Sequence, residues 1–221
     1  MEKETELAKY VIEYLNSQHW EVYQEVEFKY QSGVADIVAV RNNIMWIIEC
    51  KLAYTLSVLE QATRWPAHYR SIAIPSSRNT RNYRVAVDYY HVGVIEVIDN
   101  YPGSSIFAKE VILPKLFIHN NPTVKKYLKQ LTELHKTYAQ AGSNKGDHLT
   151  PYKQTMIALR AFISAHPGCT INEIYKHLGK MHYSSVASFK GSVLTALYEF
   201  EPWCRIDTSS KPYKLFIKES L

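Results

Sequence analysis

The stretch of residues 33–51 constrains the fold of this chain more than any other. Two apolar runs rich in β-branched residues, 33–40 and 44–51, flank the short polar segment Arg41-Asn42-Asn43. Each run has the length of a strand, and the polar segment has the length of a tight turn. We therefore predict a β-hairpin here and expect the rest of the chain to be organised around it.

Three charged side chains interrupt the apolar runs at one end of the predicted hairpin. Asp36 lies near the start of the first strand, and Glu49 and Lys51 close the second. Side chains along a strand alternate between its two faces, so Glu49 and Lys51 share a face while Cys50 points away. Because the second strand returns beside the first, we expect Asp36, Glu49 and Lys51 to converge.

The chemistry of this trio indicates a metal site. Two carboxylates side by side repel each other, and burial among apolar residues raises the penalty. A divalent cation relieves the repulsion, and Mg²⁺ typically takes one or two carboxylates together with water and substrate phosphate. Lys51 would then orient or deprotonate a water molecule, or stabilise charge on a phosphate. These residues suit metal-assisted hydrolysis of a phosphodiester.

The order of these residues resembles a nuclease signature. Asp36 followed by Glu49-Cys50-Lys51 at the end of an apolar strand is similar to the PD-(D/E)xK motif, with Ala35 where the family name has proline. The resemblance covers about residues 1–100 and is to the restriction-endonuclease-like and archaeal Holliday-junction-resolvase-like branch. It implies that Asp36, Glu49 and the backbone carbonyl of Cys50 hold Mg²⁺, with Mn²⁺ as a substitute, and that Lys51 assists the attacking water.

Two further polar residues resemble accessory positions of that branch. Glu6 lies on an expected helix over residues 4–17, and Gln61 lies on an expected helix within residues 52–70. The resemblance implies that Glu6 supports the metal site and that Gln61 supports the substrate. Taken without the resemblance, Glu6 is a favourable acid in a first helical turn, and Gln61 is an exposed polar residue of a helix.

The remaining periodic segments predict an α/β fold. Expected strands lie at 20–30, 71–75, 92–98 and 105–113, and a helix over 124–138 closes the domain or leads to the next. With the first helix and the hairpin, this order predicts a mixed central sheet flanked by helices, which is the restriction-endonuclease-like core.

The expected strand at 20–30 contains two acids of open interpretation. Val22, Val26 and Phe28 are expected to face one way for part of its length. Glu25 and Glu27 are expected on a solvated strand face, although one of them is an alternative extra ligand for the metal.

Several arginines follow the predicted site along the chain. Guanidinium groups grip phosphate bidentately, and a polar loop over the active end of a sheet can follow a DNA backbone. A solvated surface is the alternative for each of them. The candidate DNA contacts are Arg64, Arg78, Arg81 and Arg84.

A glycine-containing polar stretch predicts a domain boundary. Residues 141–150 lack apolar periodicity and suit a linker between a nuclease-like domain, 1–140, and a second domain, 151–221. Thr150-Pro151 predicts the start of a helix, with threonine as its cap.

The second domain resembles a winged helix-turn-helix module. Three amphipathic helical segments are followed by a predicted hairpin around residues 203–217, and Thr170 and Glu173 have the spacing of a capping box. The resemblance implies that the third helix enters the major groove while the hairpin meets phosphate; a protein-docking module is the alternative. The candidate contacts are Tyr183, Ser185, Ser188, Lys190, Lys211 and Lys214.

The net positive charge is concentrated in the C-terminal part of the chain. From Ser143 onward there are 10 Lys and Arg against 6 Asp and Glu, so this smaller part carries +4 of the net charge of +5, a hint of a polyanionic partner.

No apolar run approaches the ~20 residues of a membrane span. The 3 cysteines are isolated, which disfavours a disulfide framework. We expect a protein of the cytoplasm, or of the host cytoplasm if it is phage-encoded, with no membrane partner.

The sequence thus predicts a metal-dependent endonuclease acting on double-stranded or branched DNA. A nuclease domain followed by a winged helix also resembles the end-cleaving subunit of heteromeric transposases, although that family has Gln-x-Lys where this chain has Glu-Cys-Lys. A homodimer or a partner recombinase subunit is therefore among the expected assemblies. The alternative function is a non-catalytic regulator or inhibitor that binds nucleic acid or protein on a nuclease-like fold.

Overall fold

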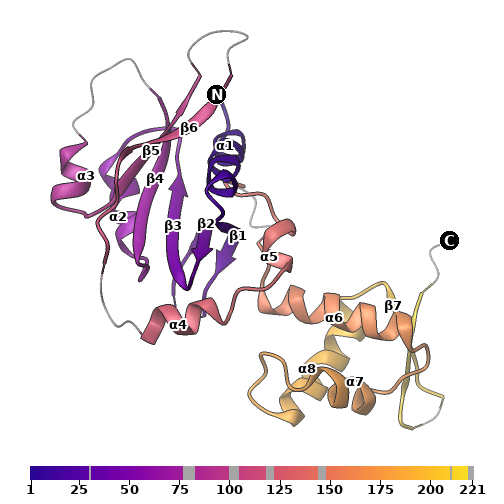
Figure 1. Ribbon diagram of the computed structural model, residues 1–221. Coiled ribbons are helices and arrows are strands. Elements are labelled where there is room, and N and C mark those ends of the chain that lie inside the picture. Colours follow the sequence, from indigo (N-terminus) through magenta and orange to yellow (C-terminus); the bar gives the residue numbers. More distant parts are fainter. Residues whose placement is uncertain are drawn as a thin grey trace. The chain divides into compact units, whose positions relative to one another are not determined.

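A mixed sheet forms the centre of the first part of the chain (Figure 1). In the computed structural model the described residues are 1–29, 31–76, 83–99, 105–117, 122–143, 148–209 and 211–218. Among them the sheet has six strands in sequence order: β1 (Glu21–Glu27), β2 (Val34–Arg41), β3 (Ile44–Cys50), β4 (Tyr69–Pro75), β5 (Gly93–Ile98) and β6 (Phe107–Ile112). The β3–β4 and β4–β5 pairs are parallel and the other pairs are antiparallel, so the predicted mixed α/β sheet is confirmed.

The predicted central hairpin is confirmed as β2 and β3. Its turn places Asn42 and Asn43 at φ 51° and 64°, the left-handed conformation that a two-residue hairpin turn requires and that asparagine tolerates. The register pairs Ile37 with Ile48. Asp36 and Glu49 are the next residues along the two strands, so both lie at the end of the hairpin opposite its turn.

Helices cover both faces of the sheet. On one face α1 (Glu4–Ser17) buries Leu7, Val11 and Leu15 among residues of the central strands. The other face is covered by α2 (Leu56–Thr63), α3 (Arg84–Asp88) and α4 (Pro122–Leu128). Side chains of β3 alternate between these two cores, which is what a strand buried on both sides requires.

The strand β1 departs from the predicted pattern. Val22 packs in the core under α1, whereas Val26 and Phe28 pack in the core on the opposite face. The expectation that these three residues face one way is therefore wrong. The reason lies between them, where Glu25 has a φ of 48°, a left-handed conformation that shifts the alternation of the strand.

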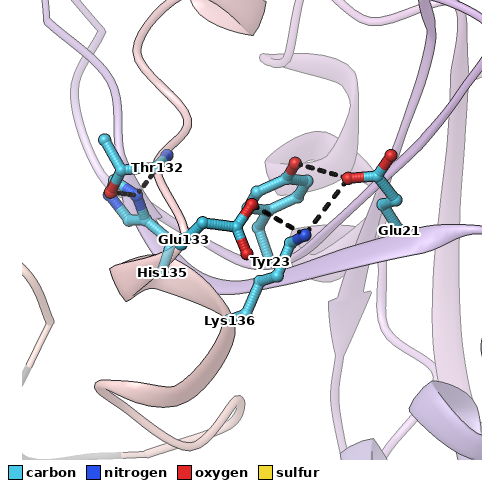
Figure 2. Close-up of polar contacts among 6 residues, drawn as sticks. All are labelled: Glu21, Tyr23, Thr132, Glu133, His135 and Lys136. Carbon is cyan, nitrogen blue, oxygen red and sulfur yellow. Dashed lines mark hydrogen bonds and ion pairs between the residues drawn. The ribbon is translucent and has the colours of Figure 1, made fainter.

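The helix predicted over 124–138 is interrupted. The structure has α4 and then α5 (Leu134–Thr137), separated by a turn. In that turn the backbone N–H of Thr132 donates to Nδ1 of the buried His135, at 3.1 Å, and the Thr132 hydroxyl lies 2.9 Å from the same nitrogen (Figure 2). This local bonding stabilises the turn between the two helices.

The chain divides into two compact units, 1–149 and 150–221. The second unit contains, among its described residues, α6 (Pro151–Ala165), α7 (Ile171–Leu178), α8 (Val186–Glu199), β7 (Cys204–Asp207) and β8 (Lys214–Ile217). The predicted helix starts are confirmed, because Thr150 caps α6 and Thr170 with Glu173 forms the capping box of α7. No described helix has the length and apolar character that crossing a membrane needs.

The predicted linker is packed where it begins. Ala141 is fully buried, and its backbone N–H donates to Oε1 of Gln24 at 3.1 Å. Leu149 is buried as well, while residues 144–147 lie outside the described part of the chain. The start of this stretch therefore belongs to the first unit, because its amides find acceptors on β1.

Candidate active site

Two buried carboxylates lie at paired strand ends. Glu49 is fully buried and Asp36 is 8% exposed. Oδ2 of Asp36 accepts a hydrogen bond from the backbone N–H of Cys50, at 2.7 Å. Oε1 of Glu49 accepts one from the indole N–H of Trp65, at 2.5 Å. Each carboxylate is thus held by at least one hydrogen-bond donor.

The second carboxylate oxygen of Glu49, Oε2, indicates what the site can bind. Oε2 is buried and has no hydrogen-bond partner among the described residues. Leaving a buried acceptor unsatisfied costs about 1–3 kcal/mol, and more for a charged group. A cation or a proton would remove that penalty. The hard oxygen donors of Asp36 and Glu49 fit Mg²⁺, which commonly uses one or two protein carboxylates.

Burial and mutual repulsion perturb both acids. The pKa of Asp36 is raised by burial, although Lys51 and the Cys50 N–H oppose the change. The pKa of Glu49 is raised by burial and by the charge of Asp36. The pair therefore holds a proton more tightly than exposed carboxyls do, and a divalent cation would compete with that proton.

Lys51 forms an ion pair with an acid that the sequence did not single out. Its Nζ lies 2.8 Å from Oε2 of Glu4, and the two side chains are 30% and 17% exposed. Burial lowers the pKa of Lys51, but Asp36, Glu4 and Glu49 together raise it above its usual value. The Lys51 ammonium therefore stays charged at neutral pH. A charged ammonium can stabilise negative charge on a phosphate, but it cannot take a proton from water.

Glu25 is a third acid near the pair. The pairs Gln24–Ile37 and Val26–Ala35 flank it, so the register places Glu25 opposite Asp36. Its Oε1 accepts the backbone N–H groups of Gly142, at 2.8 Å, and Ser143, at 3.3 Å.

The surroundings of Glu25 raise its pKa. Burial and then the charge of Asp36 raise the pKa of Glu25 to about 7. The solvated face expected for Glu25 is wrong, because the residue is 6% exposed, whereas Glu27 is exposed as expected. No local signal in the sequence predicts this burial, since the amides that cover the carboxylate come from distant residues.

The structure distinguishes two acids of α1. Glu6 is exposed, and its Oε2 accepts the backbone N–H of Glu2 at 3.4 Å. Glu4 meets Lys51 instead. Residues two apart on a helix differ in direction by about 200°, so Glu4 and Glu6 cannot both face the same site. The structure brings Glu4, and not Glu6, to the predicted trio.

The end of α2 contributes a residue that the sequence reasoning missed. Trp65 follows α2, packs in the core beside Phe28 and bonds Glu49. A buried indole needs an acceptor for its N–H, which is the signal that could have linked it to the acid at the end of a neighbouring apolar strand. Gln61 lies one turn earlier and is half-buried, and its side chain makes no hydrogen bond with the described residues.

The predicted arginines lie in different settings. Arg64 is exposed just after α2, and its backbone carbonyl accepts a hydrogen bond from Gln31 at 3.1 Å. Arg84 is exposed at the start of α3. Arg78 and Arg81 lie outside the described residues.

Several predicted contacts in the second unit have internal partners. The Tyr183 ring lies edge-on to Phe189, with centroids 5.6 Å apart. The Ser185 hydroxyl caps α8 by accepting the Ser188 N–H at 3.1 Å. The remaining candidates are Lys190, whose Nζ lies 5.8 Å from the ring centroid of Tyr175, and Lys211 and Lys214, which are exposed on the hairpin.

The described residues contain no group of three or more His, Cys, Asp or Glu side chains arranged to hold a metal ion. A metal at Asp36 and Glu49 would therefore take its other ligands from backbone, water or substrate. The Cys50 thiol is buried and its pKa is raised by burial, so only its backbone carbonyl suits the role implied for it.

Comparison with known proteins gave no match. No protein-family model, no curated protein and no solved structure is significantly similar to this chain. Its function must therefore be inferred from the residues and geometry described above.

Proposed function

We propose that this protein is a metal-dependent endonuclease that hydrolyses phosphodiester bonds in DNA. The observation that carries the proposal is the buried pair Asp36 and Glu49, in which Oε2 of Glu49 has no partner among the described residues. Burying a carboxylate oxygen without a hydrogen-bond donor is unfavourable unless a proton or a cation satisfies it, and two adjacent acids favour a cation. Phosphodiester hydrolysis is the chemistry that a cation, two carboxylates and an ammonium serve together.

Each residue has a distinct role in this proposal. Asp36, Glu49 and the Cys50 carbonyl would hold Mg²⁺ or Mn²⁺. When bound, the ion polarises a phosphoryl oxygen and lowers the pKa of a water molecule. Lys51, kept charged by the surrounding acids, would stabilise negative charge that develops on the phosphate. Glu4 would hold the Lys51 ammonium in place through their ion pair.

The order of elements supports the assignment to the PD-(D/E)xK nucleases. A helix, three strands, a helix and a further strand, α1 to β4, follow one another as expected for the restriction-endonuclease-like core. In the second unit, α6, α7 and α8 followed by a β-hairpin support the winged-helix proposal. Its excess of basic residues supports DNA, double-stranded or branched, as the partner.

The direct test is cleavage of DNA with defined metals. Supercoiled plasmid, single-stranded DNA and a branched junction are incubated with the protein in Mg²⁺, in Mn²⁺ and in EDTA. We expect cleavage with either metal, none in EDTA, and a loss of at least about 100-fold in Asp36→Ala and Lys51→Ala. Lys125→Ala, an exposed residue of α4, serves as the control. Cleavage that persists in EDTA or in Asp36→Ala would refute the proposal.

A second candidate is a regulator or inhibitor that binds nucleic acid without cutting it. It is favoured by the engagement of Lys51 with Glu4, at 2.8 Å, which occupies the ammonium that a nuclease needs. Binding of the same DNA with no cleavage in any metal, together with no binding of Mn²⁺, would select this candidate.

A further inference from the structure

The segment after α4 runs alongside the edge strand β1. We call residues 132–143 the strap. Gln24 anchors its middle with both ends of its amide, donating to the Lys136 carbonyl at 2.8 Å and accepting from the Ala141 N–H at 3.1 Å. Because Gln24 precedes Glu25, the strap reaches the candidate active site as it passes along the strand.

The outer end of the strap is fastened by a charged cluster (Figure 2). Nζ of Lys136 lies 2.9 Å from Glu133 and 3.2 Å from Glu21, an exposed residue at the start of β1. The Tyr23 hydroxyl donates to the same oxygen of Glu21 at 3.0 Å, and Lys136 lies 5.2 Å from the Tyr23 ring centroid. Exposed ion pairs are each worth at most about 1 kcal/mol, so this fastening is releasable.

The inner end of the strap meets the site itself. The N–H groups of Gly142 and Ser143 donate to the buried Glu25 carboxylate. Gly142 has a φ of 77°, and a Cβ there would lie 2.7 Å from the carbonyl carbon of Glu4. Since Glu4 holds Lys51, the strap contacts both the acid opposite Asp36 and the residue that positions the ammonium.

A loop that only covers the edge of the sheet would not need hydrogen bonds to the Glu25 carboxylate or a left-handed backbone at that residue. Edge strands are commonly protected by a loop that hides their unpaired backbone groups. Here the two strap amides bond a carboxylate, and the backbone of that residue is held at a φ of 48°. Strained backbone of this kind persists where the surrounding structure enforces it, often at functional sites.

We propose that Glu25 is a positioning residue of the candidate active site, and that docking of the strap on β1 sets the affinity of Asp36 and Glu49 for a divalent cation. The inference rests on the proposed function. Glu25 does not itself join these two acids in a ready-made metal group among the described residues. It acts through Asp36, which lies opposite it in the register.

The first experiment compares two changes at Glu25. Glu25→Ala removes the acceptor of the strap amides, so we expect the Gly142 and Ser143 amides to exchange with solvent at least about ten-fold faster. Binding of Mn²⁺ alone, measured by calorimetry, should weaken about ten-fold, as for other groups that orient metal ligands. Glu25→Gln keeps an oxygen acceptor, so it should restore most of the amide protection and of the Mn²⁺ affinity.

The second experiment displaces the strap without replacing an acidic residue. Gly142→Ala creates a clash with Glu4, whereas Gly179→Ala has the same kind of positive φ, 69°, but nothing within 4 Å of the added Cβ. Only the first should weaken Mn²⁺ binding. Lys136→Met should speed amide exchange of the strap by up to about five-fold, with Lys125→Met as its control.

The outcomes separate this inference from the proposed function. If wild-type protein binds Mn²⁺ and cuts DNA, and Glu25→Ala and Gly142→Ala loosen the strap without changing Mn²⁺ affinity, the strap is a cover only and the inference is overturned. If wild-type protein binds no Mn²⁺, the proposed function fails first. A coupled loss of amide protection and Mn²⁺ affinity in both variants supports the inference.

Discussion

Trp65 donates its indole N–H to one oxygen of the Glu49 carboxylate and leaves the other oxygen, Oε2, buried without a partner among the described residues. The two residues are 16 positions apart and meet because α2 returns the chain to the sheet beside β3. This arrangement holds an acid in place while keeping one of its lone-pair sites open. For this reason we expect the site to bind a cation, and we expect the unsatisfied oxygen to destabilise the protein when no cation is bound.

Trp65→Phe should destabilise the metal-free protein. The change keeps a ring against Phe28 but removes the only donor seen on Glu49 in the described part of the chain. A loss of about 1–3 kcal/mol in the free energy of unfolding is expected, measured by urea denaturation in EDTA. Trp203→Phe, whose indole bonds the partly exposed Glu201, is the matched control. Equal losses in the two variants would contradict a special role for the Trp65 bond.

The stability of the metal-free protein should depend on pH through Glu25. Burial and the charge of Asp36 raise the pKa of Glu25 to about 7 from an ordinary value of 4.5. A raised pKa means that the folded state binds the proton more tightly than the unfolded state does. The resulting stabilisation is complete below pH 4.5 and is lost as the pH rises through about 7.

Melting temperatures from pH 5 to pH 8 in EDTA measure this effect as a difference between wild type and Glu25→Gln. Glutamine cannot ionise, so the variant should gain stability relative to wild type as the pH rises. The comparison cancels contributions from histidines such as His135, whose pKa is lowered by burial. Adding Mg²⁺ should raise the melting temperature of wild type more at pH 8 than at pH 6, because protons compete with the ion. A wild-type-to-variant difference that does not change with pH would contradict the assignment.

The two acids of α1 offer a matched pair for mutation. Glu4→Gln weakens the partner of the Lys51 ammonium, whereas Glu6→Gln changes an exposed side chain two residues away. We expect Glu4→Gln to lower the rate of DNA cleavage about ten-fold, because Glu4 holds the Lys51 ammonium in place. Glu6→Gln should leave the rate unaltered. Steady-state assays at saturating Mg²⁺ decide between them. A larger effect at Glu6 would favour the accessory role that the sequence resemblance implied.

The hairpin of the second unit should bind DNA phosphates. Replacing the exposed Lys211 and Lys214 by alanine is expected to weaken DNA binding evenly across sequences. The slope of log affinity against log salt should become shallower by about one for each phosphate that the protein no longer neutralises. Lys176→Ala, in the last turn of α7, is the control. An unchanged salt slope in the double variant would indicate that the hairpin does not meet DNA.

Local patterns were sufficient for most of the fold. The alternation and turn residues around Asn42 and Asn43 predicted the central hairpin, and the caps at Thr150 and Thr170 predicted where two helices begin. These features depend on neighbours within a few residues, so the sequence displays them directly. The register of the hairpin then follows, and with it the placement of Asp36 and Glu49 at one end.

The contacts around the Asp36 and Glu49 pair, including those of the neighbouring Glu25 and Lys51, depend on residues far away in the chain. The acceptor for the Gly142 N–H is Glu25, 117 positions earlier, and the partner of Lys51 is Glu4, 47 positions earlier. Alternation along an isolated strand assigned Glu25 to solvent, because a local pattern cannot show the strap that covers this residue or the left-handed backbone beneath it. The order of amino acids is thus enough to place Asp36 and Glu49 together at one end of the hairpin. Packing between distant segments selects the acid that meets the ammonium and the indole that holds Glu49, and it sets how deeply the carboxylates are buried, since each of these depends on contacts formed after the sheet and its helices come together.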